Sequence, residues 1–310
     1  LHPVAHSFPT RRSSDLTPHI LLINPWIHDF AAYDFWARPL GLLYLGAILR
    51  LHGLTVSFID CLDRFHPQAN QNDKTDVSAK TKPDGRGPYL KEPISVSPAL
   101  KDVPRQFSRY GIKPQWFLDE LKAVRQKPDL ILVGSGMTYW YTGLCETIRF
   151  IRKVFPEVPV VLGGTYATLC YEHAKANSGA DLVVRGPAEA EILKIISEFT
   201  GYSESLAFDP EDFNTWPYPT YDLQRNISYV PILTSTGCPF SCSYCASNFL
   251  NPRRKIRNPG QVTEEINYWH QKYAVVNFAF YDDALLIDPE NHIHLILETI
   301  IREGKNVRFH

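Results

Sequence analysis

The segment HILLIN, His19–Asn24, is a short apolar run that stops at Pro25, and it predicts a buried β-strand. The apolar pattern of 40–52, ended by Gly53, predicts a helix, and residues 55–60 predict a second strand. The same alternation continues with strands at 129–134, 158–163 and 181–185 and helices at 117–126, 141–155, 167–177 and 188–199. Strands alternating with helices are typical of an α/β fold, so we expect a doubly wound, Rossmann-like parallel sheet over 17–205.

A second alternation follows a proline-containing linker at 206–228. Strands are expected at 231–235, at 275–281 and from 307 onward, with helices at 262–273 and 292–303. Residues 229–310 therefore predict the beginning of another βα array that stops early. We interpret the chain as the N-terminal fragment of a longer protein.

Two other segments interrupt this order. Residues 64–115 are polar and lack periodicity, so we interpret them as an insertion, which is either a lid over a cofactor or a disordered loop. The aromatic residues Tyr110, Trp116 and Phe117 favour an ordered insertion. Residues 6–16 resemble the translation of a sequencing adapter, so residues 1–16 are set aside as an artefact or a disordered end.

The composition is that of an ordinary globular protein, with 44% apolar residues and a formal net charge of −1 among 310 residues. Such a charge gives no reason to expect binding to nucleic acid, and no apolar run is long enough to span a membrane. Three of the six cysteines fall within eight residues, which is not the pattern of a disulfide framework. We therefore expect a cytoplasmic protein.

Those three cysteines, Cys238, Cys242 and Cys245, form a C-x-x-x-C-x-x-C loop directly after a predicted strand. Three thiolates at this spacing can bind three irons of a 4Fe–4S cluster and leave the fourth iron open for a ligand. A zinc site or an electron-transfer cluster is the alternative. Either would need a fourth ligand, and the nearest downstream histidine, His270, lies in a predicted helix without a partner.

The cysteine loop, with Tyr244 before its third cysteine, resembles the signature of the radical S-adenosylmethionine (SAM) superfamily. This resemblance implies a partial (βα)6 barrel and a 4Fe–4S cluster whose open iron binds SAM. It further implies a 5′-deoxyadenosyl radical and a reducing partner such as flavodoxin or ferredoxin. By the same resemblance, Tyr244 lies near the adenine.

The next predicted strand ends in Asp282 and Asp283, where many members of the superfamily have Gly-Gly-Glu. The resemblance implies that this pair binds the amino group of SAM. The alternative is that Asp283 only caps the loop. We interpret Glu264 and Glu265, early in the preceding helix, as part of a solvated face.

The first α/β unit resembles the cobalamin-binding domain that precedes the barrel in one class of these enzymes. The matching motifs are Pro39-Leu-Gly-Leu-Leu-Tyr-Leu-Gly46, Asp129-Leu-Ile-Leu-Val-Gly-Ser135, Val161-Leu-Gly-Gly164 and Asp181-Leu-Val-Val-Arg-Gly-x-x-Glu189. Ligands of such sheets bind beyond the carboxyl ends of the strands. The candidate cobalamin-binding residues are therefore Asn24, Ser135, Thr138, Gly163, Gly164, Thr165, Gly186 and Glu189.

The D-x-H-x-x-G motif, which supplies a histidine ligand to cobalt in other cobalamin proteins, is absent, and His28 and His52 lack its spacing. The lower face of cobalamin would then be free of such a ligand, and the aromatic run of Trp26, Phe30, Tyr33, Phe35 and Trp36 is a candidate cover for it. Thr165 stands where the family often has histidine.

These features favour a cobalamin-dependent radical SAM enzyme, with methyl transfer as the expected reaction of a small-molecule or peptide substrate. The two alternatives are a radical SAM enzyme with a cobalamin-free accessory domain and a non-catalytic zinc or iron–sulfur protein. The sequence indicates no catalytic residue beyond the cofactor-binding sets. We expect the fragment to be inactive alone.

Overall fold

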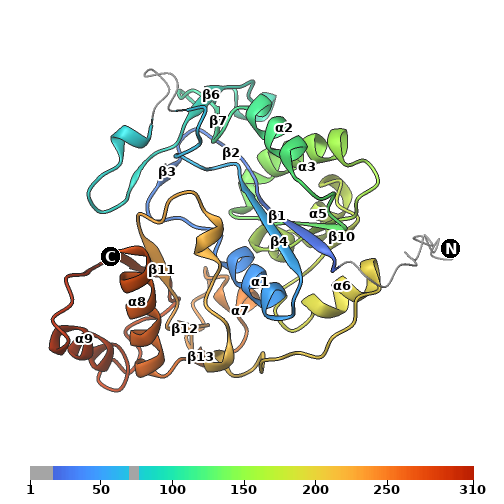
Figure 1. Ribbon diagram of the computed structural model, residues 1–310. Helices are drawn as coiled ribbons and strands as arrows, with labels where there is room; N and C mark the ends of the chain where they lie inside the picture. The colour runs from blue at the N-terminus through green and yellow to red at the C-terminus, as the bar shows by residue number, and fades with distance from the viewer. Residues whose placement is uncertain (1–16, 70–76) are drawn as a thin grey trace.

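The computed structural model describes residues 17–69 and 77–310. The predicted artefact at 1–16 lies outside the described residues, as do residues 70–76 of the insertion. Figure 1 shows two α/β units side by side, with the shared helix α1 (Leu40–Leu51) between them.

The first unit is built on a five-stranded parallel sheet in the order β10-β9-β8-β1-β4. Its strands are β1 (His19–Asn24), β4 (Thr55–Asp60), β8 (Leu130–Val133), β9 (Val160–Leu162) and β10 (Leu182–Val183). The chain runs from β1 to β4 on one side and then from β8 to β10 on the other. The strand order therefore reverses between β1 and β8, which confirms the predicted doubly wound fold.

Helices cover both faces of this sheet. One core contains residues of α1 and α6 (Ile192–Thr200), and the other contains residues of α2 (Pro114–Ala123), α3 (Tyr141–Val154), α4 (Thr165–Leu169) and α5 (Tyr171–Asn177). The predicted helix 167–177 is thus wrong as one element, because the chain breaks at Cys170. Helix α2 begins three residues earlier than predicted, with Pro114 in its first turn, a position that suits proline.

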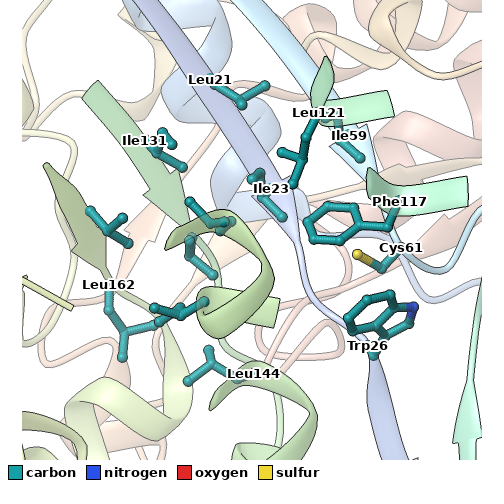
Figure 2. Packing of buried hydrophobic residues seen from close by; sticks show 14 of the residues in the cluster. Leu21, Ile23, Trp26, Ile59, Cys61, Phe117, Leu121, Ile131, Leu144 and Leu162 are labelled. Carbon is teal, nitrogen blue, oxygen red and sulfur yellow. The ribbon is translucent and has the colours of Figure 1, made fainter. Parts of the chain in front are cut away.

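Trp26 belongs to the core on the α2–α3 face, which Figure 2 shows together with Leu21, Ile23 and Phe117. It is only 1% exposed, its indole N–H donates to the Ile112 carbonyl at 2.7 Å, and its ring packs edge-on against Phe117. This burial leaves Trp26 little exposed surface, and its contact with cobalamin stays a prediction.

The second unit is a three-stranded parallel sheet in the order β11-β14-β15, and the described strands do not close into a barrel. Its elements are β11 (Val230–Ile232), β14 (Asn277–Phe280), β15 (Arg308–Phe309), α8 (Pro259–Tyr273) and α9 (Ile293–Arg302). A short antiparallel pair, β12 (Ser235–Thr236) with β13 (Lys255–Ile256), frames the cysteine loop and helix α7 (Ser247–Leu250).

Helix α1 joins the two units because opposite sides of it are buried in different cores. Leu42 and Ile48 pack with the first sheet, whereas Leu43 and Tyr44 pack with β11, β14 and α8. The predicted linker also contributes to this second core through η4 (Phe213–Thr215) and η5 (Tyr221–Leu223), where Phe213 and Tyr221 are buried.

The described part of the 64–115 insertion folds into short strands. Its strands are β5 (Gly87–Pro88), β6 (Lys91–Pro93) and β7 (Ser108–Tyr110), and its short 3₁₀ turns are η1 (Ser78–Lys80) and η2 (Pro98–Leu100). They pair with two strands that precede the insertion, β2 (Ile27–Asp29) and β3 (Tyr33–Asp34). The antiparallel pairing forms the sheet β2-β7-β6 and the pair β3-β5. The buried Arg64 anchors it by donating to the Asp34 carboxylate at 3.0 Å and to the Gly85 carbonyl.

The insertion also reaches the second unit. The Pro83 carbonyl accepts hydrogen bonds from Asn277 and Arg308, which begin β14 and β15. The cysteine loop lies beyond the opposite, carboxyl ends of these strands, so this part of the insertion is not a lid over the cysteines. Within the described residues, no helix combines the length and the apolar character needed to cross a bilayer.

Candidate functional site

A pocket with an empty volume of about 350 Å³ opens where the strand order of the first sheet reverses. It lies between the carboxyl ends of β1 and β8, the place where doubly wound sheets bind ligands. Its lining is Asn24, Pro25, Trp26, Ile27, Leu62, Ser135, Gly136, Met137, Trp140, Tyr141, Leu144 and Tyr166. Of the predicted cobalamin-binding residues, only Asn24 and Ser135 line this pocket. The pocket is too small to enclose a macrocycle, so a large ligand would lie across its opening.

The loops after β8 and β9 are held together by hydrogen bonds around Ser135. Its hydroxyl donates to the Gly163 carbonyl at 2.6 Å, and its carbonyl accepts the Thr165 amide at 2.9 Å. Gly164 has a φ of 96°, and a side chain there would collide with the Ser135 carbonyl. By contrast, a methyl group at Gly163 would meet no protein atom within 4 Å. The Gly163 backbone is therefore open to a ligand, and the site fits a group that approaches the main chain closely.

The loop after β10 is tied to the same edge, because the Gly186 amide donates to the Thr168 hydroxyl at 3.0 Å. Farther along this loop, one carboxylate oxygen of Glu189 is buried without a hydrogen-bond partner among the described residues, and burial raises the pKa of this carboxyl. A buried polar atom without a partner is unfavourable, so Glu189 is available to a ligand's donor group.

The structure supports contact with a ligand less directly for two other predicted cobalamin-binding residues, Asn24 and Thr138. Asn24 uses its side-chain amide to donate to the Asp60 carboxylate at 2.7 Å. Thr138 begins the 3₁₀ turn η3 (Thr138–Trp140) and is half-buried outside the pocket lining.

Apart from Trp26, the aromatic wall of the pocket was not predicted from the sequence. Tyr166 is 1% exposed and its hydroxyl pairs with His173 Nδ1 at 2.7 Å, while its ring stacks with Tyr141. Met137 is half-exposed at the rim. Each of these residues lies within a few positions of a predicted glycine loop, which was the available signal.

The cysteine loop is exposed at the carboxyl end of the second unit. Cys242 and Cys245 are exposed, Cys238 is half-buried, and none of the three thiols is in a disulfide. The Ser247 hydroxyl lies 3.1 Å from the Cys245 sulfur, and the Ser247 amide donates to that sulfur at 3.5 Å. These contacts lower the pKa of the Cys245 thiol, which favours the thiolate that binds metal. Tyr244 is 91% exposed.

Among residues 17–69 and 77–310, no three His, Cys, Asp or Glu side chains are already gathered in a metal-binding arrangement. The donor set of the loop nevertheless fits an iron–sulfur cluster, because three accessible thiols on eight residues are the ligands that such clusters use.

Asp282 lies directly beneath this loop. Its carboxylate accepts hydrogen bonds from the Thr234 hydroxyl and the Ser235 hydroxyl, each at 2.7 Å. The buried His292 shares the Thr234 hydroxyl through its Nε2, also at 2.7 Å. The Asp282 carboxylate is therefore occupied by hydrogen bonds that stabilise the end of β11.

Asp283 contacts both ends of the cysteine loop. Its carboxylate accepts the Gly237 amide at 3.0 Å, just before Cys238, and the Ser247 hydroxyl at 3.3 Å, just after Cys245. Asn251 donates to it at 3.2 Å. These contacts fit the loop-capping interpretation of Asp283, and they leave binding to SAM as a prediction.

The prediction that Glu265 belongs to a solvated face is wrong. Glu265 is 1% exposed and forms a buried ion pair with Arg257, whose side chain is 5% exposed. The indole of Trp269 donates to the same carboxylate at 3.3 Å. Burial of a charged pair is tolerated because each member is hydrogen-bonded, whereas Glu264 is exposed as predicted.

The two candidate sites are neighbours. Helix α4 follows β9 and begins at Thr165, and it packs against α7, which follows Cys245. The edge of the first sheet that carries the glycine loops thus faces the cysteine loop of the second unit.

Comparisons with known proteins agree with this arrangement. Residues 117–196 match the model of the B12 binding domain family. The anaerobic magnesium-protoporphyrin IX monomethyl ester cyclase of Synechocystis sp. is 27% identical over 183 residues, which cover 50% of this chain and 37% of the cyclase. The alignment with the cytidylyl-2-hydroxyethylphosphonate methyltransferase of Streptomyces wedmorensis is 333 positions long at 20% identity, and it covers 88% of this chain and 56% of the relative.

Among solved structures, the radical SAM methyltransferase TsrM from Kitasatospora setae shares the fold with a TM-score of 0.58 at 16% identity. That match covers 94% of this chain and 54% of TsrM. The chain spans about half or less of the length of the relatives it matches. The comparisons confirm the predicted resemblance to radical SAM enzymes with a cobalamin-binding domain, and they confirm the predicted fold class.

Proposed function

We propose that this chain provides the cobalamin-binding and cluster-binding parts of a radical SAM enzyme that transfers a methyl group to a small-molecule acceptor. The observation that carries the proposal is the packing of α4 against α7. This contact brings the open backbone of Gly163 and the thiols of the cysteine loop to one shared edge. A methyl transfer that uses two cofactors requires such closeness, because both must reach one substrate.

The proposal gives the named residues separate tasks. Cys238, Cys242 and Cys245 would hold the 4Fe–4S cluster. Asp283 keeps the two ends of their loop together through Gly237 and Ser247. When bound, the cluster, SAM and cobalamin would supply the radical and methyl-transfer chemistry, while the protein supplies their placement.

On the cobalamin side, Gly163 lets the ligand approach the main chain, and Gly164 fixes the shape of that loop against Ser135. The unpartnered oxygen of Glu189 would accept a hydrogen bond from the ligand. Tyr244 at the adenine, a flavodoxin- or ferredoxin-type reductant and a cytoplasmic location stay predictions.

The test is anaerobic reconstitution of the full 310-residue chain with iron and sulfide, followed by reduction and electron paramagnetic resonance. We expect about four irons per chain and a cluster signal that changes when SAM is added. Cys242→Ala should lose this signal. Cys145→Ala, at a half-buried cysteine on α3, is the matched control and should keep it.

Stoichiometric zinc without a cluster would eliminate the radical enzyme in favour of a zinc-binding protein. Cobalamin is tested separately, by retention of the corrinoid absorbance through gel filtration. A chain that forms the cluster but retains no cobalamin would refute the cobalamin assignment and leave a radical SAM enzyme with an accessory domain. Neither measurement depends on turnover.

A further inference from the structure

A second pocket lies at the carboxyl end of the edge strand β4, and it shares no residue with the pocket at the sheet's reversal point. Its empty volume is about 420 Å³. It is lined by Arg38, Phe58, Asp60, Asp63, Leu223, Gln224, Arg225 and Asn226, and we call it the Arg38 pocket. It lies between the first sheet and the segment that leads into the second unit.

Arg38, which lines this pocket, has an unused fork of donors. Its Nε and Nη2 are buried and have no hydrogen-bond partner among the described residues. The guanidinium is held over the ring of Tyr229 at 4.3 Å, and the main-chain amide donates to the Tyr281 hydroxyl at 3.0 Å. Nε and Nη2 lie on the same edge of a guanidinium, the edge that binds a planar carboxylate through two parallel hydrogen bonds.

The acidic residues nearby do not use this fork. Asp34 accepts hydrogen bonds from Arg64 and Tyr229. Asp63 is paired with Arg225 at 2.5 Å. A buried guanidinium edge without an acceptor is unfavourable, so the pocket favours a ligand that brings an acceptor of its own.

The facing wall carries amide groups that are also unused. Both the oxygen and the nitrogen of the Gln224 side chain are buried without a partner among the described residues, as is the Asn226 side-chain oxygen. Because both Gln224 atoms are unpartnered, this conclusion does not depend on which way the amide is turned. The wall offers acceptors to a ligand that carries a donor.

Charge narrows the class of ligand further. Burial and the neighbouring Asp63 raise the pKa of Asp60 to about 6 whereas Arg38 lowers it, so a ligand's negative charge is favoured beside Arg38 and disfavoured beside Asp60 and Asp63. A dianion such as phosphate would meet more repulsion here than a monovalent carboxylate.

We infer that the Arg38 pocket binds a small carboxylate that also carries a hydrogen-bond donor, as hydroxy and amino acids do. The carboxylate lies on the Nε–Nη2 edge of Arg38, and the donor is directed at Gln224 and Asn226. This pocket shares no lining residue with the pocket at the reversal point, although Asn24 of that pocket donates to Asp60 of this one, and the inference does not depend on the proposed function.

The experiment titrates the full chain with L-lactate and with L-serine at neutral pH and follows binding by ligand-observed NMR. Binding should saturate with a Kd of about 10 mM or tighter. Propane-1,2-diol, in which a hydroxymethyl group replaces the carboxylate of lactate, should not bind. Propionate, which lacks the donor, should bind at least threefold more weakly, by about 0.7 kcal/mol.

Arg38→Lys keeps the charge but removes the fork, and it should weaken lactate binding roughly tenfold. Gln224→Met removes the amide in a side chain of similar length and should weaken it about threefold. Arg50→Gln is the matched control, because Arg50 is a surface arginine on α1 paired with Asp222, and its binding should be unchanged.

Three results would overturn the inference. They are no saturable binding of either carboxylate, lactate binding that Arg38→Lys leaves intact, and inorganic phosphate binding more tightly than lactate. If Arg38→Lys fails to fold, Gln224→Met together with the propionate comparison decides the question.

Discussion

Gly164→Ala is the substitution whose effect the structure defines most closely. Gly164 has φ 96° and ψ −164°, a conformation that essentially only glycine adopts. An added Cβ would lie 2.4 Å from the carbonyl oxygen and 2.8 Å from the amide nitrogen of Ser135. Both contacts are with main chain, which cannot rotate away as a side chain would.

The expected loss of unfolding free energy combines two effects. The disfavoured backbone conformation contributes about 1–3 kcal/mol, and the displaced Ser135 main chain contributes about 1–3 kcal/mol more. Because relaxation of the loop relieves part of both, we expect a total of about 2–4 kcal/mol. The hydrogen bonds between Ser135 and the loop after β9 would be lost with it.

Urea unfolding followed by circular dichroism measures this difference, and Gly163→Ala is the matched control. A methyl group at Gly163 meets no protein atom within 4 Å, so stability should change by less than about 0.5 kcal/mol. The same control should weaken cobalamin retention, because that methyl group occupies the space proposed for the ligand. Equal stability of the two variants would refute the packing described for this loop.

Two further predictions concern the pH dependence of stability. Burial alone would raise the pKa of Glu146, but hydrogen bonds from His28 and Arg109 lower it to about 2. This lowered pKa stabilises the fold above the ordinary glutamate pKa of about 4.5, and the stabilisation is lost as the pH falls toward 2. Between pH 6 and pH 3, the free energy of unfolding measured in urea should therefore fall more for the wild type than for Glu146→Gln. Equal losses would contradict the ion network. Asp60 has the opposite sign, because burial and Asp63 raise its pKa to about 6. The contribution of Asp60 to the free energy of unfolding is present below about pH 4 and is lost as the pH rises through 6. Asp60→Asn should therefore flatten the dependence of stability on pH between pH 4 and pH 7. An unchanged dependence would show that Asp60 ionises normally.

The sequence predicted the first sheet well because most of its strands are short apolar runs. Strands at 19–24 and 55–60 are confirmed residue for residue, since each is bounded by a clear break such as Pro25 or Gly53. Helix ends were less accurate. The start of α2 was missed because Pro114 and Gln115 precede the apolar pattern that begins at Trp116.

The insertion was expected to be ordered, but its strands could not be predicted because they show no periodicity. Its strands are two or three residues long, too short to show alternation. They are held by partners distant in sequence, such as Arg109 with Glu146 and Arg64 with Asp34. Tertiary contacts of this kind leave no local pattern.

The site residues could be predicted where a local sequence pattern marks them, and could not where only tertiary contacts do. The cysteine loop was visible because its spacing is itself the signal, and the glycine loops were visible because they follow predicted strands. Glu265 was misassigned, because a glutamate on a helix is usually solvated and only the fold reveals Arg257 beside it. The Arg38 pocket could not be predicted from the sequence, since its residues come from three separate segments of the chain.

The placement of the glycine loops relative to the cysteine loop depends on helix α1 more than on either sheet. Gly46 lets this helix approach β1 and the linker closely, because a side chain there would lie 2.6 Å from the Thr220 hydroxyl and 3.0 Å from Leu22. The other side of α1 buries Leu43 and Tyr44 in the core of the second unit. The first sheet and the cysteine-bearing unit therefore cannot separate without exposing apolar surface on α1. Since α4 also packs against α7, the distance between the glycine loops and the cysteines is fixed by packing.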